Sequence, residues 1–365
     1  MSKVIYLDAP DLGKLEKKYL CEAIDTGYVS TAGKFVDTFE KRFSDFLGIK
    51  KAVAVQSGTA AIHISLYELG IRAGDEVIVP AVTFVATANP VVYLGAKPVF
   101  VDVNPDTWNI DVEKIEEKIT EKTKAIIPVH LYGNPADMEG IEWIAKRYGL
   151  YVIEDATESL GAKFKGRYTG TIGDLGCFSF NGNKLITTGG GGMVVGNNTE
   201  KLEHIKFLIN QARDRSKEYY HPEIGFNYRM TNIEAALGLA QMEKINIFLE
   251  KKKRFNQIYK EELKNLKFIS FQEEYEGAES SWWLTAVVIN RDINITYLQK
   301  ELKKRGIQTR RIFTPLVEFP MYKESRDKYP VSYRIYDRGL CLPSSTLNSE
   351  DDIFYVTKTL KELLK

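Results

Sequence analysis

Cysteine, histidine and long apolar runs are all scarce in this sequence of 365 residues. The three cysteines, Cys21, Cys177 and Cys341, are widely spaced and odd in number. This argues against a disulfide framework and paired zinc-binding cysteines, and indicates a reducing compartment. None of the four histidines has the i, i+4 spacing of a helical metal site. Because no uncharged apolar stretch of about 18 residues and no leader-like N-terminus occurs, we expect a cytoplasmic protein without a metal or a membrane anchor.

Net charge is also nearly absent, since 50 Lys plus Arg oppose 49 Asp plus Glu and leave a formal charge of +1. Such a chain has no global field that would attract nucleic acid or an anionic membrane. The hydrophobic fraction of 44% and the charged fraction of 27% are typical of a soluble globular enzyme. At roughly 150 residues per domain, the length predicts two or three domains, or one large domain carrying a smaller one.

From about Lys51 to Val195, short β-branched runs alternate with helical periodicity, which is typical of βαβ units around a mostly parallel sheet. The predicted strands are AVAVQ from Ala52, EVIVP from Glu76, PVFVDV from Pro98, KAIIPVH from Lys124, YVIEDA from Tyr151, CFSFN from Cys177 and GMVVG from Gly192. Helices are predicted over 59–69, 111–119 and 137–147. We therefore expect an α/β fold with seven strands and helices on both faces of the sheet.

The pattern changes after Gly225. From Thr231, apolar residues recur every three or four positions for about 35 residues, which predicts one long or bent helix leaving the first domain. Beyond about Phe268, strand-like WWLTAVVI and CLPSS alternate with helical patterns over 296–305 and 350–364. We predict a large domain over 1–245, with an N-terminal arm, and a smaller α+β domain over 246–365.

Ligands of open parallel sheets bind at the carboxyl ends of the strands, and a small-residue motif follows the first predicted strand there. Ser57-Gly58-Thr59-Ala60-Ala61 opens a predicted helix. Its small residues allow the backbone to close on an anion, and helix-start amides with the Thr59 hydroxyl can bind a phosphate. A helix capped by Ser57 or Thr59, with Gly58 in the turn, explains the motif equally well.

Three ionisable residues lie at or after the ends of two other predicted strands. Asp155 ends an apolar strand, where a carboxylate requires a cationic partner, although an N-cap or a structural ion pair is an alternative. Glu158 is either a capping partner or a second ligand contact. Lys184 lies between a strand and a glycine run, where burial can depress its pKa and make its amine a nucleophile, although most lysines are solvated. The lysine precedes the glycines, so this is not a P-loop.

Together these three features require one ligand with a phosphate, a cationic ring nitrogen and an aldehyde. Pyridoxal 5'-phosphate (PLP) has all three groups. Asp155 would keep its pyridine nitrogen protonated, so that the ring can withdraw electrons, and Lys184 would bind its aldehyde.

The chain resembles the DegT/DnrJ/EryC1/StrS family of nucleotide-sugar aminotransferases, which have the PLP-transferase fold type I. The motifs that carry the resemblance run through nearly the whole chain: SGTAA, PAVTFVATANP, HLYGNPADM, VIEDATESLGA, FSFNGNKLITTGGGGMVV, IGFNYRMTNIEAALGLAQME and RGIQTRRIFTPLVEFPMY. The resemblance implies that Lys184 binds PLP covalently, that Asp155 contacts the pyridine nitrogen and that Glu158 lies near the ring hydroxyl.

The same resemblance implies the remaining cofactor contacts. Gly58, Thr59, Ala60 and Ser179 match the phosphate-binding positions. Phe84 matches an aromatic residue packed on the cofactor ring, although plain core packing is the alternative. Asn227 matches a residue that reaches the phosphate of the neighbouring subunit, which implies an obligatory homodimer.

The implied reaction is a two-step transfer of an amino group from L-glutamate to a keto sugar linked to a nucleoside diphosphate. Asn181, Gly190 and Val317 depart from the family's usual Phe, Glu and His, and they leave the substrate open. The SFNGNK and TTGGGG variants are similar to members that make 4-amino-6-deoxyhexoses, which favours amination at C4 for bacterial surface glycans. Amination at C3, a small non-nucleotide ketone, and a non-catalytic PLP-binding regulator are the alternatives. A dehydratase is disfavoured because such members carry histidine in place of Lys184.

Candidate substrate contacts follow from the need of a diphosphate for cations and of a sugar or base for hydrogen bonds and stacking. They are Lys34, His130, Tyr132, Arg213, Trp283, Arg310, Arg311 and Val317. For all of these except Trp283 and Val317, surface placement or packing at a strand end is the alternative.

Overall fold

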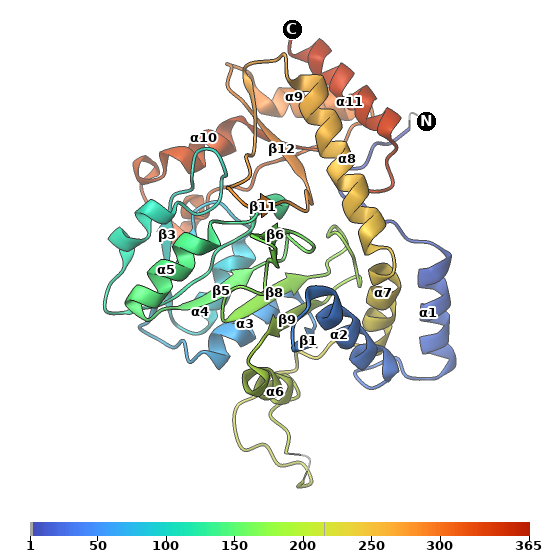
Figure 1. The fold of residues 1–365 in the computed structure, drawn as a ribbon, viewed down its shortest axis with the longest axis vertical. Helices are drawn as coiled ribbons and strands as arrows, with labels where there is room; N and C mark the ends of the chain where they lie inside the picture. Colours follow the sequence, from blue (N-terminus) through green and yellow to red (C-terminus); the bar gives the residue numbers. More distant parts are fainter. Residues whose placement is uncertain (1–2, 215) are drawn as a thin grey trace.

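The computed structural model describes residues 3–214 and 216–365. Its largest sheet has seven strands in the order β1-β9-β8-β5-β4-β2-β3 (Figure 1). The strands are β1 (Lys51–Val55), β2 (Glu76–Pro80), β3 (Lys97–Val101), β4 (Thr123–Ile126), β5 (Tyr151–Asp155), β8 (Leu175–Ser179) and β9 (Gly192–Gly196). Only β9 runs antiparallel to its neighbours, β1 and β8. The predicted seven-stranded, mostly parallel sheet is confirmed.

Helices cover both faces of this sheet because its strands are apolar on both sides. Val53 and Ile153 face a core that includes α3 (Gly58–Glu68) and α6 (Thr199–Leu208). Ala54 faces the opposite core, which includes α2 (Lys34–Leu47) and α7 (Asn232–Met242). Further helices in this part of the chain are α1 (Lys14–Asp25), α4 (Asn89–Tyr93) and α5 (Met138–Tyr148). This confirms the predicted helices near 59–69 and 137–147.

The helix predicted over 111–119 is wrong. That stretch forms two short 3-10 turns, η2 (Val112–Lys114) and η3 (Glu116–Lys118). Of the residues in those turns and between them, only Ile115 is fully buried. One anchoring side chain provides too little buried area to stabilise a longer helix, since most helical stability in proteins comes from packing an apolar face.

The long periodic segment forms α7 and α8 (Ile245–Leu263), with a two-residue break at Glu243 and Lys244. At the break, Lys244 Nζ lies 2.6 Å from Glu16 Oε1 of α1 and donates to the carbonyl of Asp11. These contacts hold the chain at the bend, so the bent form of the predicted helix is the observed one. Figure 1 shows α8 leading from the large sheet toward the C-terminal elements.

The C-terminal part contains a four-stranded sheet in the order β10-β12-β14-β13. Its strands are β10 (Ile269–Phe271), β12 (Thr285–Ile289), β13 (Arg310–Arg311) and β14 (Gly339–Leu342), and its helices after α8 are α9 (Ile295–Lys304), α10 (Pro330–Arg338) and α11 (Glu350–Leu363). Ile5 is buried in the hydrophobic core between this sheet and its helices, and it forms a parallel bridge with Ile307. The N-terminal segment therefore packs on the C-terminal unit. The predicted division at residue 245 stays a prediction.

A small third sheet joins loops of the two parts. It pairs β11 (Ala278–Glu279) with β6 (Lys163–Phe164), which also pairs with β7 (Arg167–Tyr168). Among the residues that the structure describes, no helix combines the length and apolarity needed to cross a membrane. The cytoplasmic location stays a prediction.

Candidate active site

A cavity of about 310 Å³ lies beyond the carboxyl ends of β5 and β8, where parallel sheets bind ligands. The predicted site residues that line it are Gly58, Thr59, Phe84, Asp155, Glu158, Asn181, Ser179, Lys184, Gly190, Trp283 and Arg310. Residues far apart in the sequence therefore share one cavity.

Lys184 reaches the cavity from a turn that follows β8. Its backbone N–H donates to the carbonyl of Asn181 at 2.9 Å. Its Nζ atom lies 3.7 Å from Glu158 Oε1 and 4.1 Å from the centroid of the Trp283 ring. Burial lowers the pKa of the Lys184 amine, against the opposing charges of Glu158 and Asp155. A lysine with a depressed pKa is more readily neutral and nucleophilic.

Asp155 ends β5 and is 3% exposed. Thr87 donates its hydroxyl to Oδ2 at 2.7 Å, and the N–H of Thr157 donates to Oδ1 at 3.2 Å. Both oxygens are thus oriented by hydrogen bonds in a cavity that also contains Lys184. Thr87 is not among the site residues predicted from the sequence, although Thr83 and Thr87 in PAVTFVATANP have the i, i+4 spacing that can place two hydroxyls together. In the structure these two hydroxyls lie 3.0 Å apart.

Glu158 is fully buried beside Lys184, and burial raises the pKa of its carboxyl. Its Oε2 atom accepts the N–H of Tyr132 at 2.8 Å. The Tyr132 hydroxyl accepts the N–H of Phe313 at 3.1 Å, and Phe313 lines the cavity. Tyr132 is buried and does not line the cavity, so its predicted role as a substrate contact is wrong. Its hydrogen bonds instead hold the Glu158 carboxylate and the Phe313 backbone in place.

The sequence predicts an anion site at the start of α3, and Gly58 and Thr59 there line the cavity. Ser57 caps this helix, its hydroxyl accepts the N–H of Ala60 at 3.1 Å, and its carbonyl accepts the N–H of Ala61. Gly58 and Thr59, whose amides precede this first intrahelical bond, both line the cavity, as a phosphate site at a helix start requires. A Cβ on Gly58 would lie 2.8 Å from the Cβ of Ser179, which is why the backbone can close here only with glycine. The Ala60 amide is already used by Ser57.

Phe84 is 55% exposed and lines the cavity, with its ring centroid 5.9 Å from that of Phe313. The core-packing alternative for Phe84 is therefore excluded. An exposed aromatic face at a cavity can stack on a flat ligand ring.

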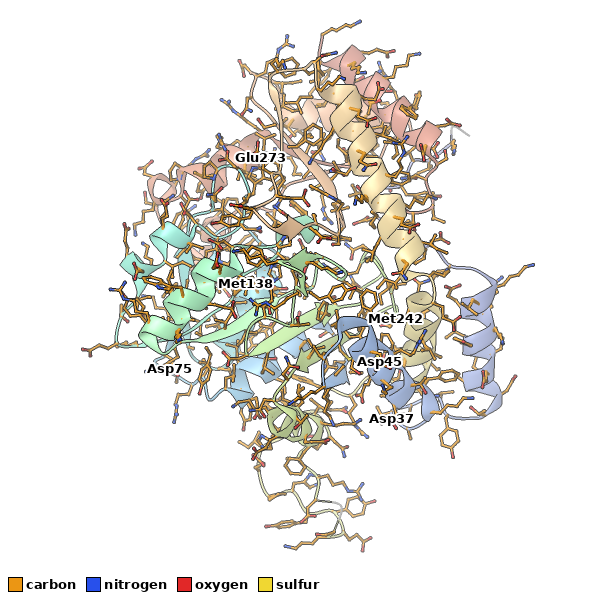
Figure 2. The ribbon with its side chains drawn as sticks, in the orientation of Figure 1. Asp37, Asp45, Asp75, Met138, Met242 and Glu273 are labelled. Atoms are coloured by element: carbon orange, nitrogen blue, oxygen red, sulfur yellow. The ribbon has the colours of Figure 1, made fainter. Side chains whose placement is uncertain are left out.

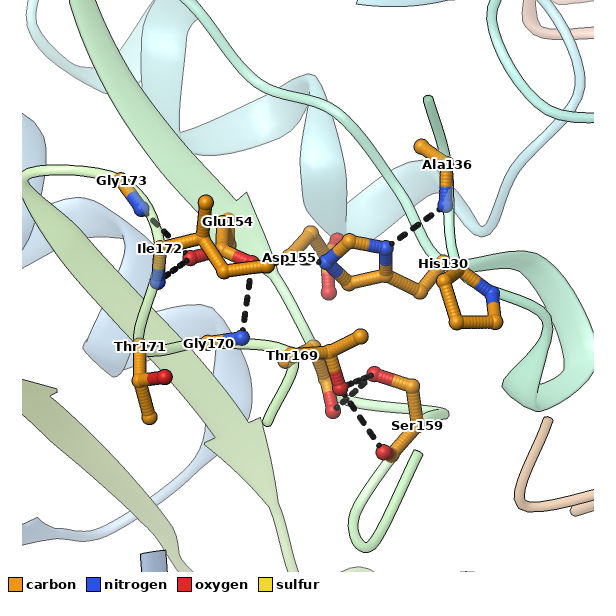
Figure 3. Close-up of polar contacts among 12 residues, drawn as sticks. His130, Ala136, Glu154, Asp155, Ser159, Thr169, Gly170, Thr171, Ile172 and Gly173 are labelled. Atoms are coloured by element: carbon orange, nitrogen blue, oxygen red, sulfur yellow. Dashed lines mark hydrogen bonds and ion pairs between the residues drawn. The ribbon is translucent and has the colours of Figure 1, made fainter. Parts of the chain in front are cut away.

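His130 is a second correction, because it is fully buried and makes a structural contact (Figure 3). Its Nδ1 accepts the N–H of Ala136 at 3.0 Å, which leaves the proton on Nε2 to be donated to Glu154 Oε2 at 3.0 Å. Glu154 also accepts the N–H groups of Gly170, Ile172 and Gly173. His130 thus fixes the residue before Asp155 and cannot contact a substrate.

Val317 is the third correction. It is fully buried in the core that contains α3, because its short turn η5 (Leu316–Glu318) packs inward. An apolar side chain without exposure cannot contact a sugar. Arg311 lies outside the cavity lining and donates to the carbonyl of Tyr336.

Three further predicted residues lie on the surface of this chain. Lys34, at the start of α2, forms an ion pair with Glu22 of α1. Arg213 and Asn227 are exposed in the segment between α6 and α7. None of the three lines the cavity, and their predicted roles stay predictions.

The residues present fit PLP. The start of α3, a carboxylate and a buried amine line one cavity, and they match the phosphate, the pyridine nitrogen and the aldehyde of that cofactor. The described residues contain no cluster of His, Cys, Asp and Glu suited to a metal.

Comparison with known proteins supports the same assignment. Residues 10–361 match the DegT/DnrJ/EryC1/StrS aminotransferase family. The chain is 40% identical over 360 residues to the GDP-perosamine synthase of Escherichia coli O157:H7, covering 99% of this chain and 98% of that one. It is also 40% identical over 364 residues to the GDP-perosamine synthase of Caulobacter vibrioides, covering 99% and 98%. The PLP form of the putative sugar aminotransferase Spr1654 from Streptococcus pneumoniae superposes with a TM-score of 0.93 at 28% identity, covering 99% and 98%.

The fold and the cavity therefore define a PLP-dependent transferase of fold type I. The chain belongs to the DegT/DnrJ/EryC1/StrS aminotransferase family and is a PLP-dependent sugar aminotransferase. This excludes the alternative of a non-catalytic regulator.

Proposed function

We propose that the enzyme transfers an amino group from L-glutamate to C4 of a nucleoside-diphosphate-linked 4-keto-6-deoxyhexose, for the synthesis of bacterial surface glycans. A GDP-linked sugar is the first choice, because two relatives at 40% identity are GDP-perosamine synthases. The observation that carries the proposal is the shared cavity of Lys184 and Asp155.

When bound, PLP supplies an electrophilic aldehyde and a ring that withdraws electrons from the carbon of the amino donor. The residues of the chain do the rest. The start of α3 at Gly58 and Thr59 would hold the phosphate, and Asp155, oriented by Thr87, would keep a proton on the ring nitrogen. Lys184 would hold the aldehyde, and its amine would move a proton at the donor carbon, as base and then as acid.

Arg310 supports an anionic substrate in this cavity. Its Nε and Nη2 atoms are buried and donate to no protein acceptor within the described residues, whereas Nη1 lies 3.5 Å from Asp8 Oδ2. Buried guanidinium N–H groups require an acceptor, and a carboxylate or diphosphate provides one. We assign Arg310 to substrate binding. Its guanidinium carbon lies 5.6 Å from the centroid of the Trp283 ring.

The segment between α6 and α7 supports the homodimer. In Figure 1 its described residues extend away from the body of the molecule. It exposes Tyr219 and Ile224, at 76% and 73%, and it also carries Arg213 and Asn227. Large apolar side chains on an extended segment favour burial by a partner. We propose that this segment reaches the site of a second copy, where Asn227 contacts the cofactor phosphate.

Subunit mixing tests the dimer. Lys184→Ala and Asn227→Ala variants should each be weakly active, and refolding them together should restore activity, because one of the two sites of a mixed dimer then has both residues intact. No gain of activity on mixing, with mixed dimers present, would contradict the shared site.

A substrate screen tests the reaction. The enzyme is first incubated with glutamate, which should remove the visible absorption band of bound PLP, and excess glutamate is removed. GDP-, UDP- and dTDP-linked 4-keto and 3-keto sugars and small ketones are then added separately, and the band should return fastest with the GDP-linked 4-keto sugar. If the band returns only with 3-keto sugars, the enzyme aminates C3, and if it returns only with small ketones, the substrate is not a nucleotide sugar. If only an amino donor other than glutamate removes the band, the assignment of glutamate is wrong.

A further inference from the structure

Lys252 of α8 is a buried cation that the proposed chemistry does not use. It is 4% exposed, and its Nζ atom donates to the carbonyls of Trp283 and Ser344, both at 2.8 Å. No carboxylate of the described chain lies within ion-pair distance of it, and burial lowers its pKa to about 7. A buried ammonium held only by carbonyls is costly, so its retention at this position calls for a reason beyond packing.

The first of these carbonyls belongs to a wall of the active site. The indole N–H of Trp283 donates to the carbonyl of Asn183 at 2.7 Å, and the Lys184 Nζ lies 4.1 Å from the centre of the same ring. Trp283 is therefore held at both ends, by Lys252 at its backbone and by Asn183 at its ring. Trp282, just before it, has a positive φ of 51°, a conformation that a non-glycine residue adopts only when its surroundings fix it.

The second carbonyl leads to the N-terminal segment. The N–H of Ser344 donates to the carbonyl of Leu7 at 2.7 Å. The next residue, Asp8, accepts the side-chain N–H of Asn183 at 3.2 Å and faces Arg310 at 3.5 Å. Lys252 thus contacts the Trp283 backbone directly and the N-terminal segment at Leu7 and Asp8 through Ser344. Both segments contact Asn183, the residue before Lys184.

We propose that Lys252 is a positioning residue, which fixes the Trp283 backbone so that the indole ring covers the Lys184 amine. The inference rests on the proposed role of Lys184. Trp283 excludes water from the amine, and the same ring forms one wall of the cavity that the substrate enters.

The cause of the lowered Lys184 pKa fixes the direction in which loss of Lys252 should change it. Desolvation by burial is the largest contribution, and it lowers the pKa of Lys184, against Glu158 and Asp155, which raise it. If Lys252 is removed and Trp283 moves away, water reaches the amine. The desolvation then weakens and the pKa of Lys184 rises toward its ordinary value.

The test compares Lys252→Met, which keeps much of the side-chain volume but cannot donate, with the adjacent, exposed Lys253→Met as the matched control. Competitive acetylation of the apoenzyme, with mass spectrometry of the Lys184 peptide, gives the titration midpoint of that amine without cofactor or turnover. We expect a higher midpoint and a roughly ten- to hundredfold lower kcat for K252M, no change for K253M, and recovery of both quantities in Lys252→Arg, which restores charge and donors.

A double-mutant cycle separates positioning from simple loss of charge. Trp283→Leu should raise the Lys184 midpoint by itself, and adding K252M to it should change the midpoint no further. Additive shifts would show that Lys252 acts by its charge and would overturn the proposal, as would an unchanged midpoint and kcat in folded K252M. Should K252M fail to fold, Lys252→Leu, which also cannot donate, is measured in the same way, and a wild-type midpoint there also overturns it. Loss of the PLP band in K184A checks the role of Lys184 separately.

Discussion

The Nζ atom of Lys184 and the Oε1 atom of Glu158 lie 3.7 Å apart inside one buried cavity, and burial acts on both groups. It lowers the pKa of the lysine and raises that of the glutamate, which moves both toward their neutral forms. The pair lies at the point where the sequence predicts that PLP is bound. The charge state of this pair therefore decides how readily the Lys184 amine reacts with an aldehyde.

Neutralising Glu158 should make the Lys184 amine less basic. Glu158→Gln removes the nearest charge that raises the pKa of Lys184, so the acetylation midpoint of the apoenzyme should move to lower pH. Exposed Glu250→Gln is the control and should leave it in place. A midpoint that stays constant or rises in E158Q would show that Glu158 is not ionised beside the amine.

The start of α3 should tolerate no side chain at residue 58. In Gly58→Ala the new Cβ would lie 2.8 Å from that of Ser179, so the phosphate-binding turn must shift. We expect at least a roughly tenfold weaker Kd for PLP, measured by absorbance titration of the apoenzyme, because helix-start amides bind phosphate only when correctly placed. Gly182→Ala is the control, since no atom lies within 4 Å of a Cβ there. Equal affinities of the two variants would contradict the phosphate assignment.

The buried Glu154 should matter for stability and not for chemistry. Figure 2 shows the side chains throughout the fold, and Figure 3 shows how this carboxylate joins His130 to three backbone amides. Glu154→Ala leaves these buried donors unpaired, and we expect a loss of about 3–5 kcal/mol in the free energy of unfolding. Denaturant unfolding measures it, with Glu142→Ala on the surface as a control expected to change it by less than about 1 kcal/mol. A small loss in both would show that the network is not stabilising.

The extended segment before α7 should be held less tightly at higher pH. Burial lowers the pKa of His204, but its hydrogen bonds to Glu223 and Glu68 outweigh this and raise the pKa above the ordinary value. Because the folded-state pKa is raised, the stabilisation is full below the unfolded-state pKa and is lost as pH rises through the folded-state pKa. Amide exchange of residues near Glu223 should therefore speed up over this pH window beyond its intrinsic pH dependence. His204→Gln should abolish this excess, and an equal excess in both proteins would rule out the His204 contact as its cause.

The sequence predicted which residues share the cavity because strand ends and special residues are local signals. Asp155 ends a short apolar strand, Gly58 and Lys184 each follow one, and parallel strands bring such residues to one edge of the sheet. His130 and Tyr132 occupy similar strand-end positions, but tertiary packing buries them, and only the three-dimensional fold distinguishes a supporting residue from a contacting one.

Long-range partners had no signal in the sequence. Lys252 belongs to a charged helical run that is typical of a solvated face, yet it is buried under the Trp283 loop. Asp8 and Arg310 meet across 302 positions of the chain. Such contacts depend on the packing of the N-terminal segment and α8 onto the C-terminal sheet, which no local periodicity encodes.

The covalent assignment of Lys184 has the most direct test. The purified enzyme is loaded with PLP and reduced with borohydride, which fixes the cofactor permanently to the amine that holds it, and the modified peptide is identified by mass spectrometry. We expect the pyridoxyl group on Lys184 and its absence in Lys184→Ala. A group attached to another lysine of the wild-type enzyme, or none on any lysine, would contradict it.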